Sequence, residues 1–264
     1  MSIEERIVTL DLCKHTVIAV DTQGVVYVWG EESIYESDTW YNTVYIPTKV
    51  NLLGSVRIRS VVCGEGFFMA LAYDGYHVFI WGKNMIYKPK NKSNSSSPVN
   101  RISGMRLGAN RYVLKIICGE RHAIMMLNNG EVWGLGDLYD GYDEFDTDSD
   151  DTDATILYSY LNNKPIQMLS DKKIVDIACG VRHTLYLDEN GDVYISGFYT
   201  KKHQEFVYLI ERNVSNIMCG LHSCVFVMEN GEIRMMGENT DGELSCIPDH
   251  KPTIRSPKCV NFPI

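Results

Sequence analysis

The strongest constraint on the fold of this chain is a segment that recurs five times. Its clearest copy, residues 177–197, reads IACGVRHTLYLDENGDVYISG. In this copy Asn190-Gly191 separates two β-type runs and predicts a type I′ hairpin turn, in which both central residues have positive φ. A single hairpin is only marginally stable in water, so the segment can direct folding only through its repetition.

The other copies keep the same order of features and end at Gly30, Gly82, Gly136 and Gly237. In copies two to five a cysteine stands 12 residues before the turn glycine. These pairs are Cys63 and Gly75, Cys118 and Gly130, Cys179 and Gly191, and Cys219 and Gly231. The first copy is looser and has Leu12 in place of the cysteine. Such a period predicts repeated units that bury their faces against their neighbours.

A second motif, a short strand led by proline, stands between copies, at Pro47, Pro98 and Pro165. No such strand precedes the first copy, but a similar piece, Pro257–Val260, occurs near the end. We therefore predict an all-β chain that forms one β-propeller domain over residues 1–264, with five four-stranded blades. We expect the C-terminal strand to complete the N-terminal blade and close the ring, which removes exposed sheet edges. A sixth, degenerate blade within residues 137–163 is the alternative.

These motifs resemble the repeats of the regulator of chromosome condensation family. The matching segments are residues 180–184 (GVRHT), 26–30 (VYVWG) and 237–244 (GENTDGEL). The resemblance covers nearly the whole chain and implies a propeller of four-stranded blades. That family usually has seven blades, whereas 264 residues divided by seven would leave about 38 for each, fewer than the 40 between Cys179 and Cys219. Five blades fit the chain better.

The recurring cysteines, glycines and histidines are interpreted as structural positions. They are Cys63, Gly64, Cys118, Gly119, His122, Cys179, Gly180, His183, Cys219 and Gly220. The histidine position is not uniform, because copy two has Phe67 there and copies one and five carry His15 and His222 one residue earlier. Nothing near the cysteines suggests a lowered thiol pKa. We expect buried, reduced thiols, no metal site and no cofactor.

The charge and composition of the chain restrict the classes of partner that we expect it to bind. The formal net charge is −9, which disfavours direct binding to nucleic acid or to an anionic membrane through overall charge. No signal-peptide pattern and no apolar run long enough to cross a bilayer is present. We expect an intracellular protein, cytoplasmic or nuclear.

Three inserts between the copies, residues 31–46, 83–97 and 137–155, differ in chemistry and are the expected binding segments. The candidates are aromatic (Tyr35, Trp40, Tyr41), basic (Lys88, Lys90, Lys92) and acidic (Asp143, Glu144, Asp146, Asp148, Asp150, Asp151, Asp153). A calcium loop starting at Asp146 would need glycine and glutamate where Asp151 and Leu157 stand. The acidic insert is therefore interpreted as a solvated loop or as a docking site for a basic partner.

No Ser/His/Asp set, phosphate-binding glycine loop or carboxylate pair of catalytic type stands out, so we do not expect an enzyme. The predicted function is a non-catalytic protein-interaction scaffold with an unidentified protein partner. The resemblance implies two alternatives. One is guanine-nucleotide exchange on a Ran-like small GTPase. The other is binding to chromatin or histones, which the acidic balance and the lack of a basic tail make less favourable.

Overall fold

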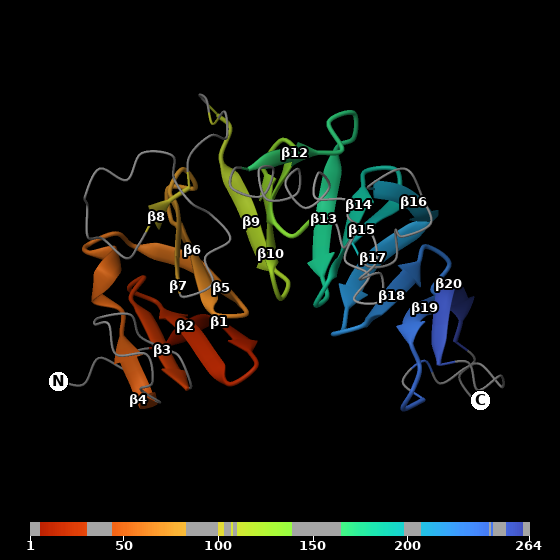
Figure 1. The fold of residues 1–264 in the computed structure, drawn as a ribbon. Coiled ribbons are helices and arrows are strands. Elements are labelled where there is room, and N and C mark those ends of the chain that lie inside the picture. Colours follow the sequence, from red (N-terminus) through yellow and green to blue (C-terminus); the bar gives the residue numbers. More distant parts are fainter. Residues whose placement is uncertain are drawn as a thin grey trace, which may run out of the picture.

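The computed structural model describes residues 6–30, 44–82, 100–102, 107, 110–138, 165–197, 207–242, 244 and 252–260. Within these residues the strands form five antiparallel sheets of four strands each. The sheets follow one another around an arc, with the first and fifth sheets at its two ends (Figure 1). No helix in the described part of the chain is long and apolar enough to cross a membrane.

Each sheet is built from consecutive strands. The first contains β1 (Ile7–Cys13), β2 (Thr16–Asp21), β3 (Val26–Gly30) and β4 (Val44–Lys49). The second, which follows a 3-10 turn at Asn51–Leu53, contains β5 (Ile58–Gly64), β6 (Phe67–Ala72), β7 (Val78–Gly82) and β8 (Asn100–Arg101). The third contains β9 (Val113–Cys118), β10 (His122–Leu127), β11 (Val132–Gly136) and β12 (Ile166–Met168). The fourth contains β13 (Ile174–Cys179), β14 (His183–Asp188), β15 (Val193–Gly197) and β16 (Val207–Glu211). The fifth contains β17 (Val214–Cys219), β18 (Ser223–Met228), β19 (Ile233–Glu238) and β20 (Thr253–Cys259).

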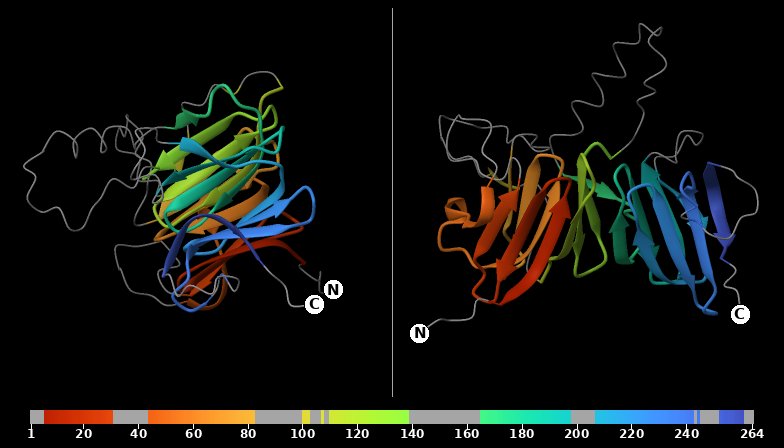
Figure 2. Two further views of the ribbon diagram at one scale, coloured as in Figure 1. Left: turned by 90° about the vertical axis from the view of Figure 1, so that its right-hand side faces the viewer. Right: turned by 90° about the horizontal axis from the view of Figure 1, so that it is seen from below.

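The first strand of every sheet lies toward the centre of the arc and contacts the first strand of the next sheet (Figure 2). Side chains bridge these inner strands. Arg59 on β5 donates to the carbonyl oxygens of Val113 and Leu114, and Lys115 on β9 donates to Asp176 at 2.6 Å. The prediction of five similar units is confirmed for the described residues.

The expected ring closure is wrong in its strand pairing. β20 pairs with β19 in the fifth sheet, and the first sheet takes its fourth strand from β4, which contains Pro47. The proline-led strands therefore complete the preceding sheet and do not open the next one. The reason is local, because a strand that follows the third strand along the chain can turn back and pair with it in antiparallel fashion. A sixth blade in residues 137–163 would fall mostly outside the described residues.

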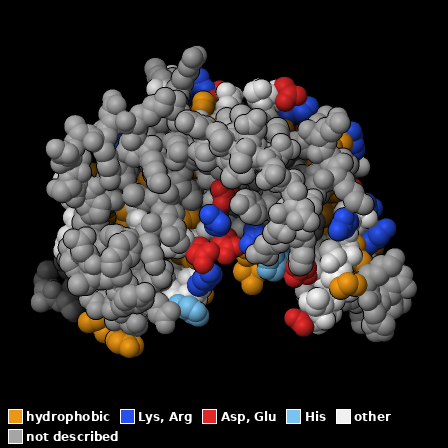
Figure 3. All heavy atoms as spheres, viewed as in Figure 1, with side chains coloured by type: hydrophobic (Ala, Val, Ile, Leu, Met, Phe, Trp, Pro, Cys, Tyr) orange, Lys and Arg blue, Asp and Glu red, His pale blue; other side chains and the backbone are white. Residues whose placement is uncertain are grey.

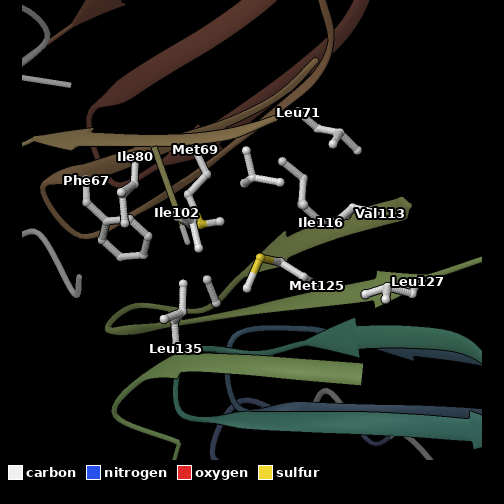
Figure 4. Close-up of a cluster of buried hydrophobic side chains, with 12 residues drawn as sticks. Phe67, Met69, Leu71, Ile80, Ile102, Val113, Ile116, Met125, Leu127 and Leu135 are labelled. Carbon is white, nitrogen blue, oxygen red and sulfur yellow. The ribbon is translucent and has the colours of Figure 1, made fainter. Parts of the chain in front are cut away.

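The hydrophobic core lies between neighbouring sheets. In Figure 4 the side chains of Phe67, Met69 and Ile80 from the second sheet face those of Met125 and Leu135 from the third. Strands β6, β10 and β14 are buried at every residue, because both of their faces are covered. Strand β18 alternates between half-buried and buried residues, so the fifth sheet packs tightly through one face only. That face carries Cys224 and Phe226 and lies against the fourth sheet.

The hairpin turns between the second and third strands are confirmed, but their type differs from the prediction. Gly191 has φ 79°, whereas Asn190 is not among the residues with positive φ. The amide of Gly191 donates to the carbonyl oxygen of Asp188, and the Asp188 side chain accepts from the amides of Asn190 and Asp192. This is a type I turn followed by a left-handed glycine. The buried aspartate at the start of the turn supplies the acceptors that favour it.

Candidate functional site

Five short turns join the first and second strands of the sheets and meet at the centre of the arc. We call them the hub turns: Cys13–Thr16, Gly64–Phe67, Gly119–His122, Gly180–His183 and Gly220–Ser223. Backbone hydrogen bonds link four of them in sequence. The amide of Glu65 donates to Glu120 O at 2.7 Å, that of Glu120 to Val181 O at 2.8 Å, and that of Val181 to Leu221 O at 2.9 Å. These four hub turns are thus held in one connected row.

The exposed residues of the hub turns carry both signs of charge. Lys14 forms an ion pair with Glu65, and its Nζ lies 3.8 Å from Glu120 Oε1. Arg182 Nε lies 3.6 Å from Glu120 Oε2. Figure 3 shows acidic and basic side chains together in the hollowed middle of the molecule. Sequence reasoning missed these residues, although they occupy the two positions of the repeat motif that vary between copies.

The carboxyl groups of Glu65 and Glu120 in the hub turns have pKa values shifted in opposite directions. The hydrogen bond from Lys14 holds the pKa of Glu65 below its usual range. Partial burial, followed by the neighbouring Glu65, raises the pKa of Glu120. Exposed ion pairs of this kind contribute little to stability, because water and salt screen them. The hub charges are therefore better suited to recognising another molecule than to holding the fold together.

Behind the hub turns, His122 and His183 are buried between neighbouring sheets. His122 Nε2 lies 2.9 Å from Thr184 Oγ1 and 3.4 Å from Cys179 Sγ, both in the next sheet. Burial, and then the nearby His183, lower the pKa of His122 to about 4, so the imidazole is neutral near pH 7. This environment suits packing and hydrogen bonding.

The recurring cysteines face the same sheet junctions. Burial raises the pKa of the Cys118 and Cys179 thiols, and hydrogen bonding to Cys224 together with burial raises that of Cys219. A hydrogen bond with Cys13 is the main cause of the raised pKa of Cys63. Every cysteine in the described residues is a free thiol.

The glycines of the hub turns are required for space. A Cβ on Gly180 would lie 2.1 Å from Cε1 of His183, and one on Gly64 would lie 2.0 Å from Cε1 of Phe67. Neither glycine has a positive φ. The ring three residues later packs over the glycine, which explains why the two residue types recur together.

The predicted partner-binding residues all lie outside the described residues, namely Tyr35, Trp40, Tyr41, Lys88, Lys90, Lys92, Asp143, Glu144, Asp146, Asp148, Asp150, Asp151 and Asp153. The first insert is shorter than expected, because residues 44–46 belong to β4. In the third insert, Asp137 is described and pairs with Arg121 at 3.1 Å, and the buried Leu138 follows it.

The positions where the described chain stops locate these inserts on the fold. A Cβ on Gly30, the last described residue before the first insert, would lie 2.0 Å from the carbonyl oxygen of His15. A Cβ on Gly82 would lie 2.4 Å from that of Gly66. Before the third insert, the amide of Asp137 donates to Arg121 O at 2.9 Å. Each insert therefore leaves the sheets beside a hub turn.

A small cavity of about 250 Å³ lies among the inner strands. It is lined by Leu10, Val61, Val62 and Ile117 together with the Asp11 carboxyl group and the Cys118 and Cys179 thiols. Asp11 Oδ2 accepts a hydrogen bond from the Cys63 amide at 2.8 Å. The volume is below the range of about 300–1,000 Å³ usual for ligand pockets.

A family model and two curated relatives that this chain matches all have RCC1 in their names. Residues 174–198 match the model of the regulator of chromosome condensation (RCC1) repeat. The chain is 28% identical over 196 residues to the Arabidopsis thaliana "RCC1 domain-containing protein RUG3, mitochondrial", a match that covers 68% of this chain and 39% of that protein. It is 27% identical over 187 residues to the Homo sapiens "RCC1-like G exchanging factor-like protein", covering 64% of this chain and 35% of that protein. The chain thus spans well under half of these curated relatives.

Solved structures show the same arrangement of sheets. Human WBSCR16 superposes with a TM-score of 0.70 at 16% identity, over 98% of this chain and 67% of that one. Prp20p from Saccharomyces cerevisiae superposes with a TM-score of 0.69 at 18% identity, over 97% of this chain and 63% of that one. At these identities the likeness establishes the fold alone, an all-β arrangement similar to RCC1 propellers.

Proposed function

We propose that this chain, whose residues 174–198 match the RCC1 repeat, is a non-catalytic protein-interaction scaffold that binds its partner through the end of the sheets bearing the hub turns. The observation that carries the proposal is that the residues that differ from one repeat to the next gather at that end. The hub charges and the attachment points of all three inserts lie there, while the buried positions repeat from sheet to sheet.

The chemistry at this end favours a protein partner. Lys14 and Arg182 are each 54% exposed and stand beside Glu65 and Glu120, so the surface mixes both charges. Mixed charges provide electrostatic complementarity to another protein and set the orientation of docking. A nucleic-acid surface would require a predominance of basic residues, which a chain with net charge −9 does not have.

Two double variants with the same change in charge test the proposed face. Lys14→Ala/Arg182→Ala removes two cations of the hub turns. Lys173→Ala/Arg212→Ala removes two cations of similar exposure, 59% and 64%, from the connections between sheets at the opposite end. After affinity purification from lysate followed by mass spectrometry, the hub variant should lose proteins that the wild type and the control variant retain.

A third variant separates the inserts from the hub turns. Replacing residues 137–155 by a Gly/Ser segment of equal length should remove a different subset of partners. Identical partner sets for the wild type, the hub variant and the insert variant, or selective loss in the Lys173→Ala/Arg212→Ala control, would contradict the proposed face.

Guanine-nucleotide exchange is a second candidate, favoured by the name of the human relative and by Prp20p, whose structure is described with its binding to Gsp1p and histones. It predicts faster release of labelled GDP from a Ran-like GTPase in the presence of this protein, and slower release with the hub variant. Release at the uncatalysed rate would eliminate exchange and leave the scaffold proposal standing.

Histone binding makes a separate prediction. Basic histone tails would bind the acidic third insert, so core histones should be retained by the wild type and lost by the variant that carries Gly/Ser at residues 137–155. Equal retention by both would eliminate the acidic insert as the histone-binding element.

A further inference from the structure

The junction between the fourth and fifth sheets contains a cluster of metal-ligating side chains. The imidazole of His183 and the thiols of Cys219 and Cys224 place their ligand atoms within 4.8 Å of one another. His183 and Cys224 are buried, and Cys219 is half-buried. Within the described residues, no other group of three or more His, Cys, Asp or Glu side chains meets in this way.

Strand register brings the three residues together. Cys219 and Cys224 are directly paired across β17 and β18, so their side chains lie on the same face of the fifth sheet. That face packs against the fourth sheet, in which β14 begins at His183. The side chains of Cys219, Cys224 and His183 therefore meet at this junction.

The preceding junctions show that Cys224 is the residue that completes the cluster. Between the third and fourth sheets the corresponding residues are His122, Cys179 and Thr184, joined by hydrogen bonds through the threonine hydroxyl. Between the second and third sheets they are Phe67, Cys118 and Ala123. Threonine and alanine are not soft metal ligands, so the same register gives different chemistry at each junction.

We propose that His183, Cys219 and Cys224 form a zinc site, with two thiolates and one neutral imidazole as protein ligands. Bond lengths of about 2.3 Å to sulfur and about 2.0 Å to nitrogen place tetrahedral ligand atoms about 3.5–3.8 Å apart, within the observed spread. Binding releases the two thiol protons to solvent. Two thiolates balance the charge of Zn²⁺, so the buried centre is neutral overall and its desolvation cost is reduced.

The ligand set is chemically suited to this ion. Thiolates favour Zn²⁺ over Mg²⁺ or Ca²⁺, and three protein ligands leave a fourth position for water or another small ligand. The proposed site departs from the sequence-based expectation of no metal, which rested on the uneven histidine positions, the poor match to a calcium loop and the absence of recognised zinc-ligand spacing. Cys224 lies outside the repeat pattern, although the Cys-x4-Cys spacing of Cys219 and Cys224 falls within the range seen in zinc sites.

The test is metal titration of the full chain, purified metal-free under reducing conditions. Zn²⁺ in competition with a chromophoric chelator should bind with a stoichiometry of one ion per chain. Co²⁺ should give the intense thiolate-to-metal absorption and the visible bands of a tetrahedral thiolate complex. Cys224→Thr copies the residue present at the preceding junction, and should weaken Zn²⁺ binding by more than about 100-fold, because loss of even an outer-shell partner costs about 10–100-fold.

Matched variants distinguish the site from adventitious thiol binding. Cys259→Ser removes an exposed cysteine of the same sheet and should bind like the wild type. Thr184→Cys completes a second set with His122 and Cys179 and should raise the stoichiometry to two ions. His183→Phe, which copies Phe67, provides an independent loss variant if Cys224→Thr does not fold.

Each outcome of these titrations either supports or contradicts the proposed zinc site. Loss of binding in Cys224→Thr or His183→Phe with retention in Cys259→Ser supports the site. No stoichiometric binding by the wild type, equal binding by wild type and loss variants, or loss in Cys259→Ser alone would overturn it.

Discussion

At the scale of single residues, the space available at the motif glycine of a hub turn depends on the side chain that packs over it. The three heavy atoms nearest to a Cβ on Gly180 all belong to the His183 ring, which is confined between two sheets. At Gly220 the nearest atom is Ser223 Oγ, at 2.7 Å, on a small and half-buried side chain. The same motif position therefore tolerates an added methyl group differently in different sheets.

Alanine at the two glycines should show this difference. Gly180→Ala forces the His183 ring out of its site, and overpacking of this kind costs about 1–3 kcal/mol of unfolding free energy. Gly220→Ala should cost less than about 1 kcal/mol, because the serine side chain can rotate away. Denaturant unfolding in the presence of a metal chelator measures both. Equal destabilisation would show that backbone conformation, not space, requires these glycines.

The buried His122 makes stability depend on pH. Its folded-state pKa of about 4 lies below the ordinary 6.5, so the unfolded chain binds the proton more tightly. Its contribution is complete above about pH 6.5 and is lost as the pH falls toward about 4, a loss of about 3 kcal/mol. His122→Phe, which copies Phe67, should remove this part of the pH dependence in denaturant titrations. Parallel pH profiles for wild type and variant would contradict the assignment.

At the scale of elements, the burial of the second strand of each sheet depends on how many neighbouring sheets cover it. Strands β6, β10 and β14 are buried along their whole length, and β6 and β10 are apolar at nearly every position. Strand β18 is buried only at alternate residues, although its sequence is as apolar as the others. Composition alone therefore does not reveal which strand has one exposed face.

Truncating one side chain in each kind of strand tests this difference. Leu127 in β10 is 1% exposed, and Leu127→Ala should cost about 2–5 kcal/mol because it leaves a cavity. Val227 in β18 is half-buried, and Val227→Ala should cost no more than about 1 kcal/mol. Chemical denaturation supplies both values. A cost at Val227 as large as that at Leu127 would indicate that another surface covers β18 in solution.

At the scale of the whole molecule, the described sheets form an arc in which each sheet is completed by the strand that follows it in the chain. β20 belongs to the fifth sheet, so the end of the described chain and its beginning are held in sheets at opposite ends of the arc (Figure 1). Backbone hydrogen bonds between hub turns connect the second to fifth sheets, and the Lys14–Glu65 ion pair connects the first sheet to the second. Each sheet is thus held in position by contacts with the neighbouring sheet.

Deleting residues 253–264 should disturb the fifth sheet and leave the first intact. Removal of β20 exposes the edge of β19, whose amides should then exchange with deuterium faster. Hydrogen exchange followed by mass spectrometry resolves peptides from β19 and from β1 to β4. Faster exchange in β1 to β4 with no change in β19 would show that the C-terminal strand pairs with the first sheet after all.

The sequence by itself determined the all-β class, the number of repeated units and the position of each hairpin turn. These features depend on local patterns, such as Asn190-Gly191 between two apolar runs and the fixed spacing from Cys179 to Gly191. Local patterns are sufficient because a turn and its two strands involve residues close together in the chain.

Only the tertiary structure decided which sheet receives β20, which charges meet at the hub turns, and which side chains join Cys219 behind them. Lys14 lies beside Glu65 and Glu120, and His183 beside Cys224, because the sheets that carry these residues pack with a particular register. Such contacts depend on the sum of many packing interactions across several sheets. No spacing within one repeat encodes that sum, so neither the charged hub nor the thiol–imidazole cluster could be found from the motif alone.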